Sequence, residues 1–333
     1  MVMDMEKRYV IGVDGGNTKA DYYLFDIDGH YIDSLRDTTC SHEVVGYEAA
    51  QSIMQARIGE LLHRNGLEMR LVAAGAFGLA GIDNSDQHER FEQIMRDIGF
   101  NNFIVDNDSF LGIIAGTSKG YGVCSINGTG TVSGGVDPHG NRLQVGGIGP
   151  LTGDDAGGRH IAQCGARRVY DSFYRCGEPT VMSEPVFDML GIVKPEQLMI
   201  AFGEYEHLLY STEMTRIVFA AAGIGDGPAL EVLDESALQL AKTSAGCVRN
   251  LRFDKDVEVV LAGSVWVKAE CPALFESYKK YMRHFLPDKG LSYNILSVPP
   301  AAGAVLWALS LTGQDPFTPV IRGHVTRAVD RYV

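Results

Sequence analysis

Residues 14–19, DGGNTK, bring a carboxylate, two glycines, an amide, a hydroxyl and an ammonium group together. They lie between residues 8–14 and 20–26, whose alternating, β-branched and aromatic side chains predict strands. A glycine loop in a β-hairpin can curl its backbone N–H groups around an anion, and Asp14, at the strand end, can hold a hydrated magnesium ion. The same residue types are common in plain turns, so this loop alone leaves both interpretations open.

The two usual nucleotide loops do not fit this segment. It has neither G-x-G-x-x-G nor G-x-x-x-x-G-K-[ST] spacing, and both of those loops need a helix directly after the glycines. A strand is predicted there instead. The candidate is therefore an anion-binding hairpin.

A second loop of this kind begins about 113 residues later. Residues 127–131, NGTGT, also separate two predicted strands, and each pair is followed by a glycine turn and a third strand, at 31–37 and 141–145. The repeat predicts an α/β protein of two similar lobes with a cleft between them, although two hairpins can also look alike by chance. Two such loops facing each other would grip a polyphosphate from both sides, as phosphoryl transfer requires.

Carboxylates at element ends are candidates for acid–base chemistry. Asp106 and Asp108 lie in VDNDSF, where a predicted strand gives way to a helix, and either could take a proton there. The alternative for Asp108 is a helix N-cap, and for Asp106 a turn acid. Asp154, in TGDDAGG, is either a ligand-binding acid or a carboxylate favoured at a helix start.

Local patterns predict the elements that position these groups. Apolar residues at helical spacing and turn residues indicate helices over 46–65, 88–99, 109–117, 166–174, 202–222 and 228–251, and further strands from 71, over 102–108 and over 257–267.

Composition limits the class of partner. The chain has 333 residues, 45% of them hydrophobic, and a formal net charge of −13, which argues against nucleic acid or an anionic membrane. The six cysteines show neither a C-x-x-C pair nor zinc spacing, which predicts reduced thiols. Residues 1–10 lack a signal-peptide pattern, and no 18-residue apolar run occurs, so we expect a cytoplasmic protein without a membrane segment.

Five stretches together resemble a known superfamily. DGGNTKADYYLFDIDG, IVDNDSFLGIIAG, INGTGTVSGG, GGIGPLTGDDAGG and VVLAGSV are similar to the phosphate, connecting and adenosine motifs of the sugar-kinase, Hsp70 and actin superfamily. Within it, they resemble the N-acetylglucosamine kinase branch, grouped with the BadF/BadG/BcrA/BcrD ATPase-like proteins. The similarity runs from residue 8 to about 310.

The resemblance implies a fold and a reaction. It implies a ribonuclease H-like (actin-like ATPase) domain repeated twice, with ATP and magnesium in the cleft and an amino sugar deeper between the lobes. We expect an N-terminal lobe over 1–117 and a C-terminal lobe over 118–333, with a last helix at about 300–312 packing back on the N-terminal lobe. The implied activity is an ATP-dependent amino-sugar kinase, with N-acetylglucosamine phosphorylated on its 6-hydroxyl as the first candidate.

The family's site residues carry over by position. Asp108, directly before the helix, would be the catalytic base, and Asp14 would hold magnesium. ATP would be bound by Gly15, Gly16, Asn17, Thr18, Lys19, Gly128, Thr129, Gly130, Gly263 and Ser264. The sugar would contact Ser41, His42, Gly78, Leu79, Ala80, Asp108, Gly147 and Asp154.

Two departures keep the sugar open. Ile148 stands where the family often has Trp, and Ser41-His42 stand where it often has Asn. Glucosamine and N-acetylmuramic acid are therefore alternative substrates, and His42 is either a substrate contact or a solvated loop residue. The cysteine cluster of the zinc-containing ROK kinases is absent.

Two other functions remain as alternatives to the kinase. An ATPase activator of the BadF/BadG type would carry a cysteine-held iron–sulfur cluster, for which the cysteine spacing gives no support. A non-catalytic sensor is the third interpretation. The family also implies a homodimer.

Overall fold

The computed structural model describes residues 8–332, which form two compact units. Unit 1 takes the described residues up to Gly122 and those from Leu296 onward, and unit 2 takes Val123–Ile295. The chain thus returns to unit 1 near its end, whereas the sequence placed a boundary after residue 117 with only the last helix returning.

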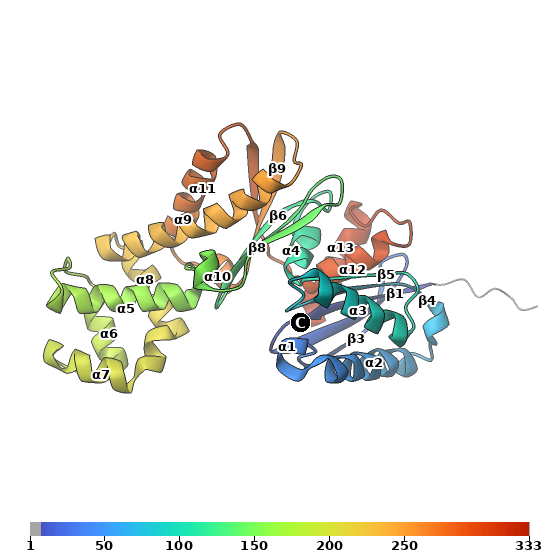
Figure 1. Cartoon of the computed structure of the whole chain (residues 1–333), viewed down its shortest axis with the longest axis horizontal. Coiled ribbons are helices and arrows are strands. Elements are labelled where there is room, and N and C mark those ends of the chain that lie inside the picture. Colours follow the sequence, from blue (N-terminus) through green and yellow to red (C-terminus); the bar gives the residue numbers. More distant parts are fainter. Residues whose placement is uncertain (1–7, 333) are drawn as a thin grey trace, which may run out of the picture. The chain divides into compact units, whose positions relative to one another are not determined.

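Unit 1 contains a five-stranded sheet and its helices (Figure 1). Its elements are β1 (Tyr9–Gly15), β2 (Lys19–Asp26), β3 (Tyr31–Thr38), α1 (His42–Val45), α2 (Tyr47–Arg64), η1 (Met69–Leu71), β4 (Val72–Leu79), α3 (Ser85–Ile98), β5 (Phe103–Asp106), α4 (Ser109–Gly116), α12 (Ala301–Ser310) and α13 (Pro319–Tyr332).

Unit 2 contains a second five-stranded sheet and a larger set of helices. Its elements are β6 (Gly122–Asn127), β7 (Thr131–Val136), β8 (Arg142–Gly146), η2 (Pro150–Thr152), α5 (Gly158–Tyr174), α6 (Ser183–Leu190), η3 (Pro195–Gln197), α7 (Leu198–Glu204), η4 (Glu206–Tyr210), α8 (Thr212–Gly223), α9 (Gly227–Asn250), β9 (Asp256–Ala262), α10 (Ser264–Lys268), α11 (Ala273–Phe285) and β10 (Gly290–Ile295).

The two sheets have the same topology. Unit 1 has the strand order β3-β2-β1-β4-β5, and unit 2 has β8-β7-β6-β9-β10. In each sheet the first strand of a meander also pairs in parallel with the fourth strand, β1 with β4 and β6 with β9. The duplicated α/β fold predicted from the repeated hairpins is confirmed, and it has the ribonuclease H-like strand order that the motifs imply.

Helices cover both faces of the unit 1 sheet (Figure 1). α2 and α3 enclose a core with Ile11, Val13, Phe77 and other apolar residues of the sheet. On the opposite face α12 packs against β1 and α4. This contact depends on glycine, because a Cβ on Gly12 would lie 2.6 Å from a backbone nitrogen of α12. α4 is thereby fixed with its N-terminus near the ends of β4 and β5.

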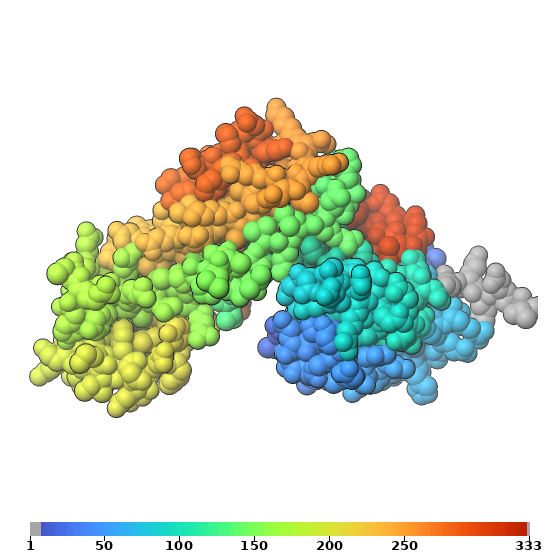
Figure 2. All heavy atoms as spheres, in the orientation of Figure 1, coloured from blue at the N-terminus to red at the C-terminus, as the bar shows by residue number. Residues whose placement is uncertain are grey.

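The core of unit 2 lies around the long helix α9, which packs against α11, β7 and α8. α5 to α8 form a helical extension of this unit, coloured green to yellow in Figure 2. The predicted helix over 202–222 is three elements, because Ser211 interrupts it and caps α8 by accepting a hydrogen bond from the N–H of Met214. Sequence patterns missed α6, α11 and α13.

None of the six cysteines, which all lie within the described residues, forms a disulfide, and four of them are buried. Across residues 8–332, the helices are either too short or too polar to cross a bilayer.

The contact between α4 and α12 gives a stability prediction. A methyl group at Gly303 in α12 would lie 2.1 Å from the carbonyl oxygen of Leu111 in α4, so we expect Gly303→Ala to lower the free energy of unfolding by about 1–3 kcal/mol. Gly59→Ala in α2 is the matched control, because a Cβ at Gly59 would have no described atom within 4 Å outside the nearby backbone of its own helix. This substitution should stabilise the folded protein by about 0.4–1 kcal/mol. Urea unfolding measures both, and equal stabilities would contradict the close helix contact.

Candidate active site

The loop between β1 and β2 is a closed hairpin turn with free backbone donors. The N–H of Gly16 donates to the carbonyl oxygen of Lys19 (3.0 Å), and the Thr39 hydroxyl donates to that of Gly16 (2.7 Å). Asn17 and Thr18 are exposed, and their N–H groups have no partner among residues 8–332. Two adjacent N–H groups without a partner in an exposed loop can donate hydrogen bonds to an anion.

The two glycines of this loop serve different purposes. A Cβ at Gly15 would lie 2.6 Å from Leu79 and 2.8 Å from the Cys40 sulfur, so packing beneath the loop requires this glycine. At Gly16 the nearest such atom is 3.6 Å away, which leaves space on that side. The sequence assigned both glycines to close approach of a ligand, and the packing role of Gly15 was missed.

Asp14 lies near the end of β1 in a strongly unfavourable place for a charge. Burial, followed by the charges of Asp108 and Asp21, raises its pKa to about 7, against the smaller opposing effect of Lys19 and Arg36. A carboxylate in this condition favours a proton or a cation as partner.

Asp108 directly precedes α4, in the N-cap position, but its side chain makes no capping hydrogen bond. The N–H of Ser109 donates instead to the side chain of Asn107 (2.9 Å), whose amide in turn donates to Asp83 (3.1 Å). Burial, followed by the charge of Asp83, raises the pKa of Asp108 to about 6, opposed by nearby backbone N–H groups. The capping alternative is therefore wrong, and the carboxylate remains available near neutral pH.

Asp106 has the local role that the sequence predicted as its better alternative. It ends β5, is buried, and accepts a hydrogen bond from the N–H of Asn107 (2.8 Å). It therefore stabilises the turn that leads to Asp108.

The predicted sugar-binding residues of unit 1 gather around the end of β4. The N–H of Ala80 donates to the carbonyl oxygen of Gly15 (2.8 Å), and the Ser41 hydroxyl donates to that of Ala80 (3.4 Å). Gly78 is covered by Leu111, and Leu79 is fully buried. Hydrogen bonds to backbone carbonyl oxygens thus connect the β1–β2 loop to the segment after β4, and that segment to Ser41 after β3.

His42 is packed rather than solvated. Its ring stacks on Tyr47 (4.4 Å between centroids), meets the edge of Phe91 (5.3 Å) and contacts the side chain of Gln87 (3.3 Å). Burial lowers its pKa, which favours the neutral ring. The interpretation of His42 as a plain solvated residue is therefore wrong, whereas a role in sugar binding stays a prediction.

In unit 2 the corresponding loop after β6 rests on the start of α5. The N–H of Gly158 donates to the carbonyl oxygen of Gly128 (2.8 Å), and the N–H of Arg159 donates to that of Thr129 (3.3 Å). The approach is close enough to require Gly157, whose Cβ would lie 2.4 Å from the Thr129 oxygen. At Gly128 and Gly130 no described atom would meet an added Cβ within 4 Å, so this loop too has an open side.

A pocket of about 530 Å³ opens beside this loop, within the size range of small-ligand sites. Among the predicted residues Gly128, Thr129 and Ser264 line it. The remaining lining is Gly158, Arg159, Tyr210, Thr212, Thr215, Arg216, Phe219, Val265, Lys268, Ala269 and Glu270. Its floor and walls offer an aromatic ring, hydroxyl groups and several cations.

Arg159 lines the pocket, although no sequence motif identified it as a site residue. Its guanidinium lies 4.7 Å from the centroid of the Tyr210 ring, a cation–π contact at the pocket wall. Thr212, Thr215 and Phe219 recur at helical spacing on α8, and this periodicity was the available signal for a shared face.

Gly263, Gly147 and Asp154 have structural roles that the sequence did not anticipate. Gly263 has a φ of +97°, and a Cβ there would lie 2.4 Å from the carbonyl oxygen of Asn127, so the close approach of the turn after β9 to the end of β6 requires glycine. Gly147 is exposed with a φ of +90°. Asp154 Oδ2 accepts hydrogen bonds from the N–H of Gly149 (2.6 Å) and the Thr152 hydroxyl (2.9 Å). Because α5 starts only at Gly158, Asp154 closes its own loop and is not a helix-start carboxylate.

The fit of a magnesium ion depends on Asp14. Among residues 8–332, no three His, Cys, Asp or Glu side chains form a group that could hold a metal. Magnesium bound to a nucleotide needs only one or two carboxylates, since phosphate and water oxygens complete its shell. Asp14 fits this requirement, because a divalent cation would offset the burial and repulsion that raise its pKa.

Two curated proteins are similar to this chain over most of its length. The N-acetylmuramic acid/N-acetylglucosamine kinase of Clostridium acetobutylicum is 26% identical over 279 residues, covering 83% of this chain and 90% of that protein. The N-acetyl-D-glucosamine kinase of Dictyostelium discoideum is 24% identical over 323 residues, covering 92% and 99%.

A solved structure from Chromobacterium violaceum, provisionally assigned as an N-acetylglucosamine kinase, shares the fold. Its TM-score is 0.61 at 20% identity, with 90% of this chain and 99% of that chain covered. The sequence pattern of one family matches residues 11–308, a span that contains both glycine loops, Asp14, Asp108 and the pocket. The chain therefore belongs to the BadF/BadG/BcrA/BcrD ATPase family.

Proposed function

We propose that this protein is an ATP- and magnesium-dependent amino-sugar kinase that transfers a phosphoryl group to the 6-hydroxyl of N-acetylglucosamine. The observation that carries the proposal is Asp108, a half-buried carboxylate directly before helix α4 that makes no capping hydrogen bond and has a pKa raised to about 6. A general base works best when its pKa is close to the working pH and its oxygen is not occupied elsewhere.

In the proposed reaction Asp108 accepts the proton of the attacking sugar hydroxyl. That oxygen forms a bond to the γ-phosphorus as the bond from phosphorus to the β,γ-bridging oxygen breaks, and ADP leaves. Asn107 holds the turn before α4 through Ser109 and Asp83, so it would keep the carboxylate in place. The N–H groups of Asn17 and Thr18 would bind phosphate oxygens.

Unit 2 would hold the rest of the nucleotide. The pocket beside Gly128 and Thr129 has the volume for a nucleoside, and Tyr210 with Arg159 offers a flat surface on which a base can stack. Phosphoryl transfer would require the nucleotide on this unit to meet the sugar held near Asp108. Binding of both substrates would therefore precede chemistry, which limits loss of ATP to water.

Magnesium would bind at Asp14 together with phosphate oxygens. When bound, it would offset the negative charge of the phosphates during transfer. The carboxylate of Asp14 would hold the ion in place, and its desolvation favours a cation over water as a partner. The cytoplasmic location and the homodimer remain predictions from the sequence.

Direct turnover tests the proposal. With ATP and magnesium, the purified protein should release ADP in the presence of N-acetylglucosamine, and NMR of the product should show a phosphate on the 6-position. Glucosamine, N-acetylmuramic acid and glucose complete the panel, since the relatives named above include an enzyme for N-acetylmuramic acid. Absence of sugar-stimulated ADP release across the panel would refute the kinase proposal.

The base role of Asp108 predicts both a rate and a pH profile. Asp108→Asn should lower kcat by about 10²–10⁴-fold while nucleotide binding persists. In the wild type, kcat/KM should rise with pH and level off above about 6, because the carboxylate must lose its proton to act as base. Asp106→Asn, which can still accept the Asn107 N–H, is the matched control and should keep activity within about tenfold. Equal losses in the two variants would argue for a structural effect.

The raised pKa of Asp14 predicts that its charged carboxylate destabilises the folded protein, so that removing this charge increases stability. A carboxylate whose pKa is higher in the folded than in the unfolded chain favours folding while it is protonated, and this advantage is lost as pH rises toward 7. Without magnesium at pH 8, Asp14→Asn should therefore stabilise the protein by about 1–3 kcal/mol, since one pKa unit corresponds to about 1.4 kcal/mol. The gain should shrink as pH falls from 7 toward 4.

Thermal unfolding across pH measures this effect, with the exposed Asp28→Asn as control. A destabilised Asp14→Asn variant at pH 8 would show that a group of the protein stabilises the charged carboxylate, and it would contradict the proposed binding of a cation there.

A further inference from the structure

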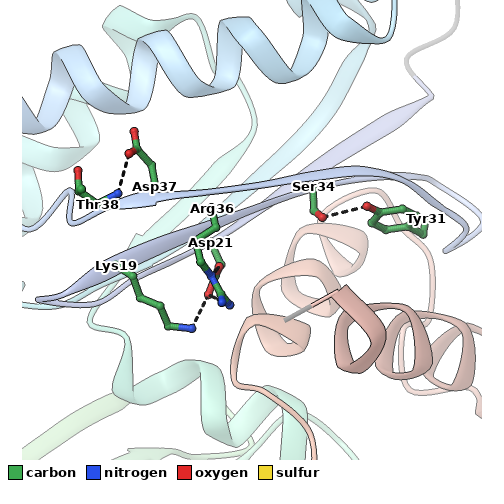
Figure 3. A network of polar contacts seen from close by, with 7 residues as sticks. All are labelled: Lys19, Asp21, Tyr31, Ser34, Arg36, Asp37 and Thr38. Atoms are coloured by element: carbon green, nitrogen blue, oxygen red, sulfur yellow. Dashed lines mark hydrogen bonds and ion pairs between the residues drawn. The ribbon is translucent and has the colours of Figure 1, made fainter.

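Lys19, Asp21 and Arg36 form an ion cluster beside the β1–β2 loop (Figure 3). Arg36 Nε donates to Asp21 Oδ1 (2.5 Å) and Arg36 Nη2 donates to Oδ2 (3.1 Å), so the guanidinium holds both carboxylate oxygens. Lys19 Nζ donates to the same Oδ2 (3.0 Å). The Asp21 side chain is 7% exposed, whereas that of Lys19 is 49% exposed.

Strand register places this cluster next to Asp14, the carboxylate proposed to hold magnesium. Asp21 pairs with Asp14 on β1 and with Arg36 on β3, and Lys19 lies two residues before Asp21 on β2. Cross-strand partners and residues two apart share one face of a sheet, so all of these side chains lie on a single face. Lys19 is also the last residue of the proposed phosphate loop, where its carbonyl oxygen closes the turn.

The charges in the cluster are unequal. Two cations contact one buried carboxylate, and Arg36 alone can satisfy both of its oxygens. Lys19 is therefore the surplus cation. Its ammonium sits on a flexible four-carbon stem, and it can leave Asp21 without leaving a buried charge unpaired.

We propose that Lys19 exchanges partners during nucleotide binding, leaving Asp21 for a phosphate oxygen, and that Arg36 is the positioning residue that makes this exchange inexpensive. The inference rests on the ATP binding proposed above and extends it to residues outside the glycine loop. With Arg36 in place, Asp21 stays neutralised when Lys19 departs. Without Arg36, departure of Lys19 would strand a buried carboxylate, so Asp21 would retain the lysine.

Two other roles for Arg36 make different predictions. If Arg36 contacted the nucleotide itself, its loss would weaken binding whether or not Lys19 and Asp21 were present. If the cluster were purely structural, its loss would change unfolding but not nucleotide affinity. Only the exchange predicts that the effect of Arg36 depends on both of the other residues.

The test is a set of mutant cycles read as the Kd of a non-hydrolysable ATP analogue with magnesium, measured by calorimetry. Arg36→Met should weaken binding about tenfold, because Lys19 must then leave an unpaired Asp21. Arg36→Met combined with Asp21→Asn should restore the affinity to within about threefold of the wild type. In a Lys19→Met background, Arg36→Met should change the Kd by less than about twofold.

Arg57→Met is the matched control. Arg57 also pairs with an acid of β3, Asp37, but from α2 on the other face of the sheet, so its removal alters charge equally and should leave the Kd unchanged. Thermal unfolding confirms that each variant is folded. If Arg36→Met does not fold, Arg36→Lys gives the same cycle, because one ammonium cannot hold both oxygens and should weaken binding about threefold.

The outcomes distinguish the partner exchange of Lys19 from the kinase proposal on which it rests. Independent effects of Lys19 and Arg36, or equal affinities in all variants, would overturn the exchange while leaving the kinase proposal intact. A wild-type protein that does not bind the analogue would overturn both. Coupling that disappears with Lys19 or Asp21 would support the exchange.

Discussion

The burial of carboxylates at one end of the unit 1 sheet is the constraint on which the site depends. Asp21 is buried in direct contact with two cations, whereas desolvation and neighbouring acids outweigh the nearby cations at Asp14 and raise its pKa to about 7, and they raise that of Asp108 to about 6. Placing uncompensated acids in a protein costs stability, and pairing them internally would remove their capacity to bind a cation or take a proton. The fold therefore maintains an unfavourable charge arrangement through packing elsewhere.

That packing relies on backbone contacts some distance from the acids. Gly78 leaves room for Leu111, and Gly303 lets α12 approach the carbonyl of the same leucine, so α4 can lie against both β4 and α12. Since Asp108 directly precedes α4, these contacts fix its position without a capping hydrogen bond from its own side chain. The side chain of Asn107 accepts the Ser109 N–H, a capping contact that Asp108 would otherwise provide.

The sequence was most informative where the pattern is local. Alternating strands around DGGNTK and NGTGT were sufficient for the hairpins, and their repetition for the duplicated sheets. Cross-strand register was not visible, so the Asp21–Arg36 pair was missed. The pocket escaped for the same physical reason: Arg159 and the α8 residues become neighbours of Gly128 only through tertiary packing. The roles of glycines were predicted only in part, since Gly15, Gly157 and Gly263 are needed where a Cβ would clash with neighbouring atoms, and no motif specifies these contacts.

The two equivalent loops show how a duplicated hairpin can acquire different support. After β6, the first N–H groups of α5 bind the loop carbonyls of Gly128 and Thr129, so the helix start positions the loop, and Arg159 in its first turn adds a positive charge. After β1 a strand follows, no helix start is present in the hairpin, and Thr39 supports the loop from β3's end. In the function proposed above, the positive charge at this loop would come from Lys19. A cation with its own resting partner suits that position, because a permanently unpaired lysine beside Asp14 would satisfy the acid that magnesium is proposed to bind.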